Sequence, residues 1–196
     1  MNGITAQAVL TEASLAKGDV LLIDAASSSL AGLIIQLAVV NGIRVFALVR
    51  DLKNEREIKE LGAELVLAQD DPQLNEKLAR SLGEMRFNAF IDSVGGDILT
   101  FVLPFMAQYG TLVVCGNMSA GRTAAIGNDQ LIYKNLTIKG FGIDRWLALN
   151  NNETIRKFYE GLAEDLYTGR LRFRKTMSVS LESGNFDQSN KVIIVS

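Results

Sequence analysis

The sequence predicts an α/β fold in which a doubly wound parallel sheet of about six strands carries helices on both faces. Short runs rich in Val, Ile and Leu recur along the chain, and most lack an alternating polar face, as expected for strands covered on both sides. Helical patterns lie between these runs. Because the connections are only a few residues long, successive strands should run parallel and be joined by right-handed crossovers.

Each expected element follows from a local pattern. Six apolar runs have strand length, and they lie at residues 20–23, 45–49, 65–67, 87–91, 111–115 and 136–138. A short helix over residues 5–15 should lead into the first strand, with a turn at residues 17–19. Residues 29–41 are apolar nearly all round, which predicts a helix buried against the sheet.

Two later helices are amphipathic. Asp71 and Pro72 suggest an N-cap followed by a proline at the first helical position. The apolar stripe of that helix consists of Leu74, Leu78 and Leu82. The clearest amphipathic helix follows the sheet, and its apolar face consists of Ile155, Phe158, Tyr159, Leu162, Ala163 and Leu166. Asn152 can cap the start of this helix and Gly169 can end it.

The last part of the chain predicts two further strands. Its basic residues are Arg170, Arg172, Arg174 and Lys175, and an apolar run follows at residues 191–195. A polar loop should separate the two strands. The pattern does not assign them to the main sheet.

Length and composition exclude several classes of protein. A chain of 196 residues can bury the core of one domain but is too short for two full-sized enzyme domains. Twenty Lys and Arg residues against 22 Asp and Glu give no electrostatic attraction toward nucleic acid or an anionic membrane. There is no histidine, and Cys115 is the single cysteine, which excludes histidine-based triads, disulfide frameworks and His/Cys zinc sites. Cys115 follows an apolar strand and is expected to be a buried core thiol.

The expected location is cytoplasmic. The N-terminus has no basic region followed by an apolar run, so no secretory signal is predicted. Residues 25–43 form the longest uncharged stretch, but serines, Gln36, Asn41 and Gly42 interrupt it. A loop followed by a helix explains this stretch better than a membrane span does.

The turn after the first strand is the first candidate for chemistry. The strand ends at Asp24, and residues 25–32 are mostly small. In open α/β sheets this turn aims helix N–H groups at a pyrophosphate, and small residues let the phosphates approach the backbone. The G-x-G-x-x-G fingerprint is absent, however. A helix cap with tight helix–sheet packing would explain the same residues, so both interpretations stay open here.

The end of the second strand favours a phosphorylated ribose. Arg50, Asp51 and Lys53 follow the strand. A guanidinium suits a 2′-phosphate, so Arg50 and Lys53 favour NADP, whereas Asp51 is the argument for NAD. A solvated turn without a ligand is the third interpretation.

Five segments in order resemble one family. They are Gly18-Asp19-Val20 with the Ala-Ala-Ser-Ser-Ser stretch at residues 25–29, Gln36-Leu37-Ala38, Leu61-Gly62-Ala63-Glu64, residues 92–96 (Asp-Ser-Val-Gly-Gly) and residues 110–116 (Gly-Thr-Leu-Val-Val-Cys-Gly). Together they resemble the cofactor-binding domain of the medium-chain dehydrogenase/reductase superfamily, over about residues 2–170. The chain is most similar to the zinc-free quinone oxidoreductases and the mitochondrial-type 2-enoyl thioester reductases. Residues 49–51 and 140–146 favour the latter.

The resemblance implies a Rossmann-like fold, NADPH as cofactor and a place for individual residues. Ser28, Ser29 and Leu30 would line the pyrophosphate, and Arg50 would hold the 2′-phosphate. The remaining residues would lie along the adenosine, the central ribose and the nicotinamide, and they are Thr5, Ser93, Val94, Gly95, Gly116, Asn117, Phe141, Gly142 and Ile143. Serine and alanine replace family glycines in the first turn.

The resemblance also sets an expectation for the domains. Residues 1–170 should be an NADP-binding, Rossmann-like domain, and residues 171–196 a remnant of the segment that packs on a missing catalytic domain. That domain supplies the proton donor and much of the substrate pocket in the family, and nothing in this chain resembles it. The segment at residues 181–190 looks abbreviated where the family has a helix. Family members commonly dimerise by continuing the sheet, so a homodimer through the strand at residues 136–138 is expected.

The expected function is therefore the NADPH-binding part of an oxidoreductase that reduces an activated C=C bond or a quinone-like acceptor by hydride transfer, incomplete for catalysis alone. The partners would be NADP(H) and a small-molecule acceptor. A Tyr-x-x-x-Lys pair and a Walker loop are both absent, and no catalytic residue or metal ligand is assigned. The alternative is a non-enzymatic nucleotide-binding or interaction module with a Rossmann-like fold.

Overall fold

A computed structural model gives the architecture of the chain, and it describes residues 1–119, 123–173, 176–180 and 191–195. Six strands form one parallel sheet in the spatial order β3-β2-β1-β4-β5-β6. Their bounds are Val20–Ile23 (β1), Arg44–Val49 (β2), Leu65–Ala68 (β3), Phe87–Asp92 (β4), Met106–Val114 (β5) and Thr137–Gly140 (β6). This order is that of the dinucleotide-binding doubly wound fold, so the predicted fold class is confirmed.

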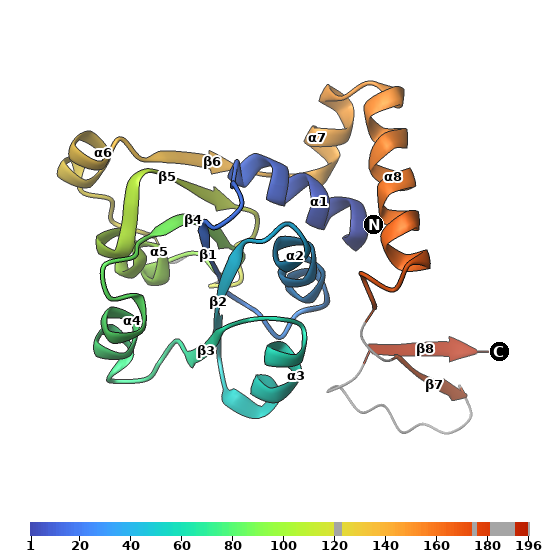
Figure 1. Cartoon of the computed structure of the whole chain (residues 1–196), viewed down its shortest axis with the longest axis horizontal. Coiled ribbons are helices and arrows are strands. Elements are labelled where there is room, and N and C mark those ends of the chain that lie inside the picture. Colours follow the sequence, from blue (N-terminus) through green and yellow to red (C-terminus); the bar gives the residue numbers. More distant parts are fainter. Residues whose placement is uncertain (120–122, 174–175, 181–190, 196) are drawn as a thin grey trace.

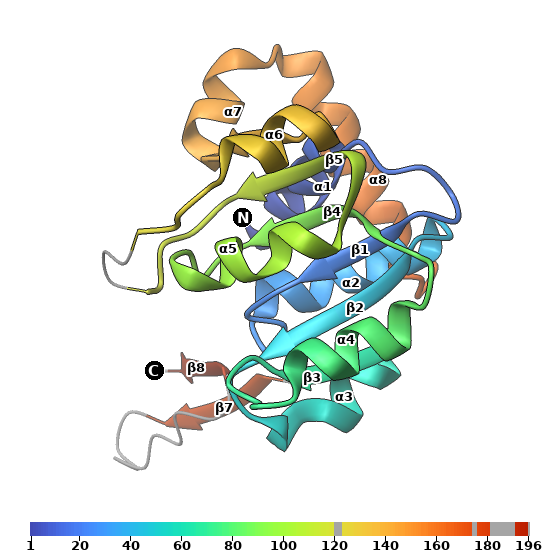
Figure 2. The same cartoon turned by 90° about the vertical axis from the view of Figure 1, so that its left-hand side faces the viewer.

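Helices lie on both faces of the sheet (Figure 1). Their bounds are Asn2–Ala13 (α1), Ser29–Val40 (α2), Glu55–Glu60 (α3), Leu74–Leu82 (α4), Asp97–Val102 (α5), Asn128–Lys134 (α6), Ile143–Leu149 (α7) and Asn152–Tyr167 (α8), with 3-10 turns at Leu52–Asn54 (η1) and Leu103–Phe105 (η2). Figure 2 shows α4 and α5 in front of the strands and α2 behind them.

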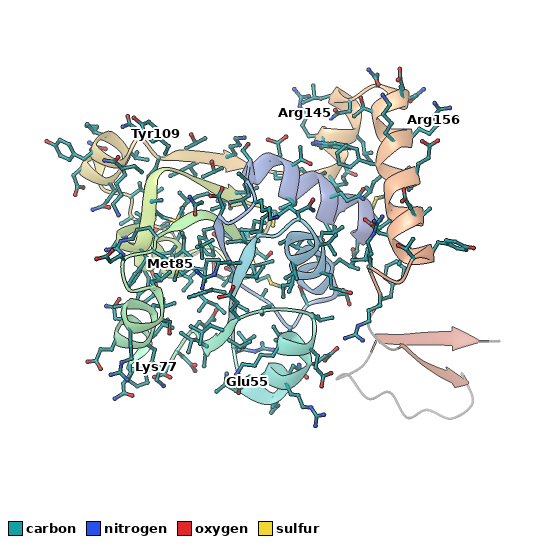
Figure 3. All side chains as sticks on the ribbon, in the orientation of Figure 1. Glu55, Lys77, Met85, Tyr109, Arg145 and Arg156 are labelled. Atoms are coloured by element: carbon teal, nitrogen blue, oxygen red, sulfur yellow. The ribbon has the colours of Figure 1, made fainter. Side chains whose placement is uncertain are left out.

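Alternating side chains of the central strands pack into two separate hydrophobic cores. In β1, Leu21 and Ile23 pack with α1 and α2, whereas Val20 and Leu22 pack with α4 and α5. All four residues are buried, so the strand has no polar face, as its sequence predicts. The charged side chains of Lys77 on α4 and Arg156 on α8 point away from these cores (Figure 3).

Several predicted boundaries were wrong by a few residues. The N-cap of α8 is Asn151, whose side-chain oxygen accepts a hydrogen bond from the Thr154 N–H at 2.8 Å, and not Asn152. Asp71 accepts from the Gln73 N–H at 2.8 Å in a turn before α4, so Pro72 is not the first helical residue. The turn closed by the Asp71 side chain precedes the helix, which starts at Leu74.

Strand β5 starts earlier than its apolar run. It includes Tyr109, which has a positive φ of 60°, and Gly110, and the pairing with β4 shifts register between Phe87 and Ala89. Apolar content therefore marks only the buried half of the strand. Cys115 follows β5 and is half-buried, packed at the margin of the core on the α1/α2 side.

The C-terminal strands pair with each other. Thr176–Ser180 (β7) and Lys191–Val195 (β8) form a separate two-stranded parallel sheet. The prediction of two strands there is confirmed. Arg174, Lys175 and the segment 181–190 lie outside the described residues.

Loops that follow β4 and β5 come very close together at Gly116. A Cβ atom built there would lie 2.4 Å from the Ser93 carbonyl oxygen. Because the obstructing atom belongs to the backbone, one of the two loops would have to move to admit a side chain. Glycine is thus required by close approach at this position.

We expect Leu78→Ala to lower the free energy of unfolding by about 2–5 kcal/mol, because Leu78 is wholly buried and its removal leaves a cavity. Leu149, which is 69% exposed, gives the matched control, and Leu149→Ala should change stability by less than about 0.5 kcal/mol. Denaturant titration measures both changes. Equal effects of the two substitutions would contradict the assigned core.

Gly116→Ala should destabilise the fold by about 1–3 kcal/mol, the usual cost of overpacking. Gly140→Ala is the control, since a Cβ at Gly140 meets no atom within 4 Å. Thermal unfolding compares the two variants. A Gly116→Ala variant as stable as Gly140→Ala would show that the two loops are not in close contact.

Candidate functional site

The carboxyl ends of β1, β2 and β4 border a cavity of about 710 Å³. Ser28, Arg50, Val94 and Gly95, all predicted to bind the cofactor, line it. Parallel strands end at the same edge of the sheet, which is why residues from three separate loops meet here. Residues that the sequence analysis did not single out add further polar and apolar lining, among them Ser27, Gln69, Asp70, Ile98, Phe101 and Met118.

The polar wall beside β1 is the start of α2. Ser28 is the N-cap, and its Oγ accepts a hydrogen bond from the Ala31 N–H at 3.1 Å. This leaves the hydroxyl proton of Ser28 available to donate to a ligand. No acidic residue lies in the first turn of α2, so the positive end of the helix dipole is not neutralised locally. Ser29 and Leu30 lie in that first turn but do not line the cavity.

Arg50 follows β2 and supplies a positive charge to the cavity. It is exposed and makes no ion pair within the described part of the chain. Asp51, the argument for NAD, is engaged elsewhere: it accepts from the Lys53 N–H at 3.1 Å, and its carboxylate lies 3.7 Å from the Lys53 Nζ. Lys53 does not line the cavity. The structure therefore brings Arg50 to the site, and neither Asp51 nor Lys53.

The loop after β4 forms the opposite wall. The Ser93 N–H donates to Asp24 Oδ1 at 2.7 Å, and the Gly95 N–H donates to Asp92 Oδ1 at 2.6 Å. The Val94 N–H lies 3.0 Å from Asp92 Oδ1 and 3.3 Å from Asp24 Oδ2. Two carboxyl groups thus hold three consecutive backbone N–H groups. Gly95, with φ of 74°, adopts a backbone conformation that favours glycine.

Asp24 and Asp92 lie behind this wall, and the sequence analysis did not name either as a site residue. Both are wholly buried. Burial raises the pKa of Asp24 to about 8, and the neighbouring carboxyl of Asp92 adds to the rise. The sequence did hold a signal for these residues, because each aspartate lies at the end of an apolar run. It did not show that the two lie together, because only the strand order makes β1 and β4 neighbours.

The residues predicted to lie near the nicotinamide occupy the adjoining ends of β5 and β6. The Phe141 N–H donates to the Val114 carbonyl at 2.8 Å, which joins the ends of these strands. Gly142 is the N-cap of α7 and Ile143 is its first residue. None of these residues lines the 710 Å³ cavity, so they form a neighbouring part of the same edge.

Gly116 and Asn117 connect the two parts of the edge. Gly116 packs against the Ser93 backbone, and a Cβ at Gly95 would lie 3.4 Å from Asn117 Oδ1. Thr5 lies in the first turn of α1, and its hydroxyl donates to the Met1 carbonyl at 3.1 Å. Thr5 does not line the cavity either.

The thiol of Cys115 has no activating environment. Burial raises its pKa, and the nearby carboxyls of Asp24 and Asp92 raise it further, while a hydrogen bond with Ser93 acts in the opposite direction. A raised pKa disfavours the thiolate that nucleophilic or redox chemistry needs. In the described part of the chain, no group of three or more His, Cys, Asp or Glu side chains is arranged so that it could hold a metal ion.

Comparisons with known proteins place the chain in a family. The chain is 31% identical to the mitochondrial enoyl-[acyl-carrier-protein] reductase of Arabidopsis thaliana, over 88% of the chain and 47% of that protein. The structure is similar to quinone oxidoreductase of Escherichia coli complexed with NADPH, with a TM-score of 0.80 and 19% identity over 93% of this chain and 56% of that one. CurA of Vibrio vulnificus in complex with NADPH gives a TM-score of 0.79 and 21% identity, over 99% and 62%.

Because the two similar structures are only 19% and 21% identical to this chain, these similarities show the fold alone. The chain spans about half the length of the curated relatives that it matches. A family model described as zinc-binding dehydrogenase matches residues 30–160, which contain the whole run from α2 to the middle of α8. The chain therefore belongs to the zinc-binding dehydrogenase family, within the medium-chain dehydrogenase/reductase superfamily that its motifs resemble.

Proposed function

We propose that this chain binds NADPH at the carboxyl edge of its sheet and is the cofactor-binding part of an oxidoreductase that reduces an activated C=C bond or a quinone-like acceptor. The observation that carries the proposal is the convergence of Ser28, Arg50, Val94 and Gly95 on one cavity. Relatives described as enoyl and prostaglandin reductases support the reaction type. When bound, NADPH supplies a hydride from its nicotinamide ring.

Three parts of the cavity match three parts of the cofactor. The N-terminus of α2 and the Ser28 hydroxyl donate hydrogen bonds to the pyrophosphate. Arg50 pairs with the 2′-phosphate, since a guanidinium can bind two phosphate oxygens at once. Ile98 and Phe101 provide an apolar wall for the adenine ring.

The loops after β5 and β6 would then position the nicotinamide. Glycine at position 116 lets the loop after β5 lie directly against the loop after β4, and Phe141 to Ile143 border the next strand end. We propose that Ser93, Asn117 and the first turn of α2, including Ser29 and Leu30, support these contacts from the adjoining positions. Thr5 and Lys53 stay predictions, as they lie outside the cavity.

The division of labour between domains is also part of the proposal. Residues 1–170 would bind the cofactor, and residues 171–196 would contribute to a surface for another domain that supplies the proton donor and the acceptor pocket. The separate β7/β8 sheet and the partial coverage of the relatives support this division. The alternative is a non-enzymatic nucleotide-binding or interaction module with a Rossmann-like fold.

A homodimer through β6 is the proposed assembly. Strand β6 is the last strand of the sheet, and its terminal residues Thr137 and Gly140 are exposed. Ile132 and Tyr133 on the preceding helix are 64% and 76% exposed, and Tyr109 lies at the same end of the molecule (Figure 3). An unpaired edge next to exposed apolar residues suits a second copy of the chain.

No helix in the described part of the chain is long and apolar enough to span a membrane. The cytoplasmic location stays a prediction, and several relatives carry the description mitochondrial.

The test of cofactor choice is Arg50→Ala. Loss of a charge-assisted contact worth about 1.5–3 kcal/mol should weaken NADPH binding about 10- to 100-fold and leave NADH binding within about threefold. Calorimetric titration with each cofactor measures both affinities. Arg56→Ala is the matched control, because Arg56 is an exposed arginine on nearby α3 that pairs with Glu60. Equal losses for NADPH and NADH would show that Arg50 does not contact the 2′-phosphate.

Sedimentation velocity tests the assembly. We expect the sedimentation coefficient to rise with protein concentration toward that of a dimer, because β6 offers unpaired backbone groups. A monomer at every concentration would contradict the proposed dimer.

A further inference from the structure

Two buried aspartates accept hydrogen bonds from the loop at residues 93–95, part of which lines the candidate cofactor cavity. Asp24 follows β1 and Asp92 ends β4, and these strands pair in parallel with Ile23 opposite Ile91. The two aspartates are therefore the next residues in register. Both side chains are wholly buried.

No cation compensates this pair. Neither aspartate takes part in an ion pair with any lysine or arginine of the described chain, and Arg50, beyond β2, makes none either. Asp24 and Asp92 face each other, and the remaining ionisable group beside them is the Cys115 thiol at the end of β5. Two adjacent carboxylates cannot both be charged in such a place without a large penalty.

One of the four carboxyl oxygens of the pair lacks a hydrogen-bond donor among the described residues. Backbone N–H groups of residues 93–95 account for both oxygens of Asp24 and for Oδ1 of Asp92. Asp92 Oδ2 is buried and has no hydrogen-bond donor among the described residues. A buried carboxylate oxygen without a donor is costly, and a proton held between the two acids removes the cost.

We propose that Asp24 and Asp92 hold a single proton between them and act as a positioning pair for the 93–95 loop in cofactor binding. The inference rests on the proposed function, because Val94 and Gly95 line the cavity assigned to NADPH. With one proton, the pair keeps three N–H groups in place. Without it, two negative charges repel each other behind the loop and also repel the anionic cofactor.

Asp24 should lose its proton within a pH range in which folding and binding can both be measured. Burial and the Asp92 carboxyl raise the pKa of Asp24 from 3.8 to about 8. The folded chain thus retains a proton that the unfolded chain releases near pH 4. Stability contributed by this group is complete below pH 4, falls as the pH rises to about 8, and is level above that.

The first experiment measures folding without any cofactor. Asp24→Asn carries a neutral amide that can donate to Asp92 Oδ2, so its stability lacks this fall. The difference in unfolding midpoint between Asp24→Asn and the native chain should grow from pH 5 to pH 8 and then level off. Asp129→Asn, which changes an exposed aspartate on α6, should run parallel to the native chain. A constant offset for Asp24→Asn over this range would overturn the shared proton.

The second experiment measures the pH profile of NADPH binding by calorimetry. The dissociation constant of the native chain should rise between pH 6.5 and pH 9, about tenfold for each unit by which bound cofactor raises the pKa of Asp24. In Asp24→Asn this rise should be absent, and NADH should show the same contrast, since the pair acts on the loop and not on the 2′-phosphate. Identical profiles for the native chain and Asp24→Asn would overturn the positioning role.

A second variant provides the same test if Asp24→Asn does not fold. Asp92→Asn also removes one of the two negative charges and should likewise abolish the alkaline rise. Absence of NADPH binding to the native chain at every pH would contradict the proposed function, while the unfolding comparison would still decide whether the proton is shared.

Discussion

Parallel pairing between β1 and β4 is the constraint on which the rest of the site depends. It brings two strands that are far apart in sequence into register, so that Asp24 and Asp92 end side by side and the loop after β4 folds back over them. The same pairing sets β1 between β4 and β2, and this brings Ser28 and Arg50 to the cavity. If the strand order were different, these residues would not meet.

The ends of β1 and β4 contribute both to the hydrophobic core and to the candidate site. Strand β1 is buried along its length and β4 at all but one position; a buried acid follows β1 and another ends β4. Buried carboxyls weaken the fold unless their oxygens find donors. Here the donors are backbone N–H groups of residues 93–95, so the hydrogen bonds that stabilise the buried acids also hold the loop after β4.

The site could be predicted in part. Small residues in the first turn indicated a phosphate-binding helix start, and the structure has Ser28 as the cap of α2. Arg50 was expected to bind the 2′-phosphate and lines the cavity. Lys53 was also expected to bind the cofactor but does not line the cavity, and its Nζ lies 3.7 Å from the Asp51 carboxylate.

The sequence by itself determined the alternation of buried strands and helices, because an apolar run without a polar face has to be covered on both sides. It also determined which residue types stand at the strand ends. Only the tertiary structure decided which strand ends are neighbours, since strand order depends on long-range pairing that no local pattern encodes. For that reason Arg50 could be identified as a candidate from its own segment, but the pairing of Asp24 with Asp92 could not.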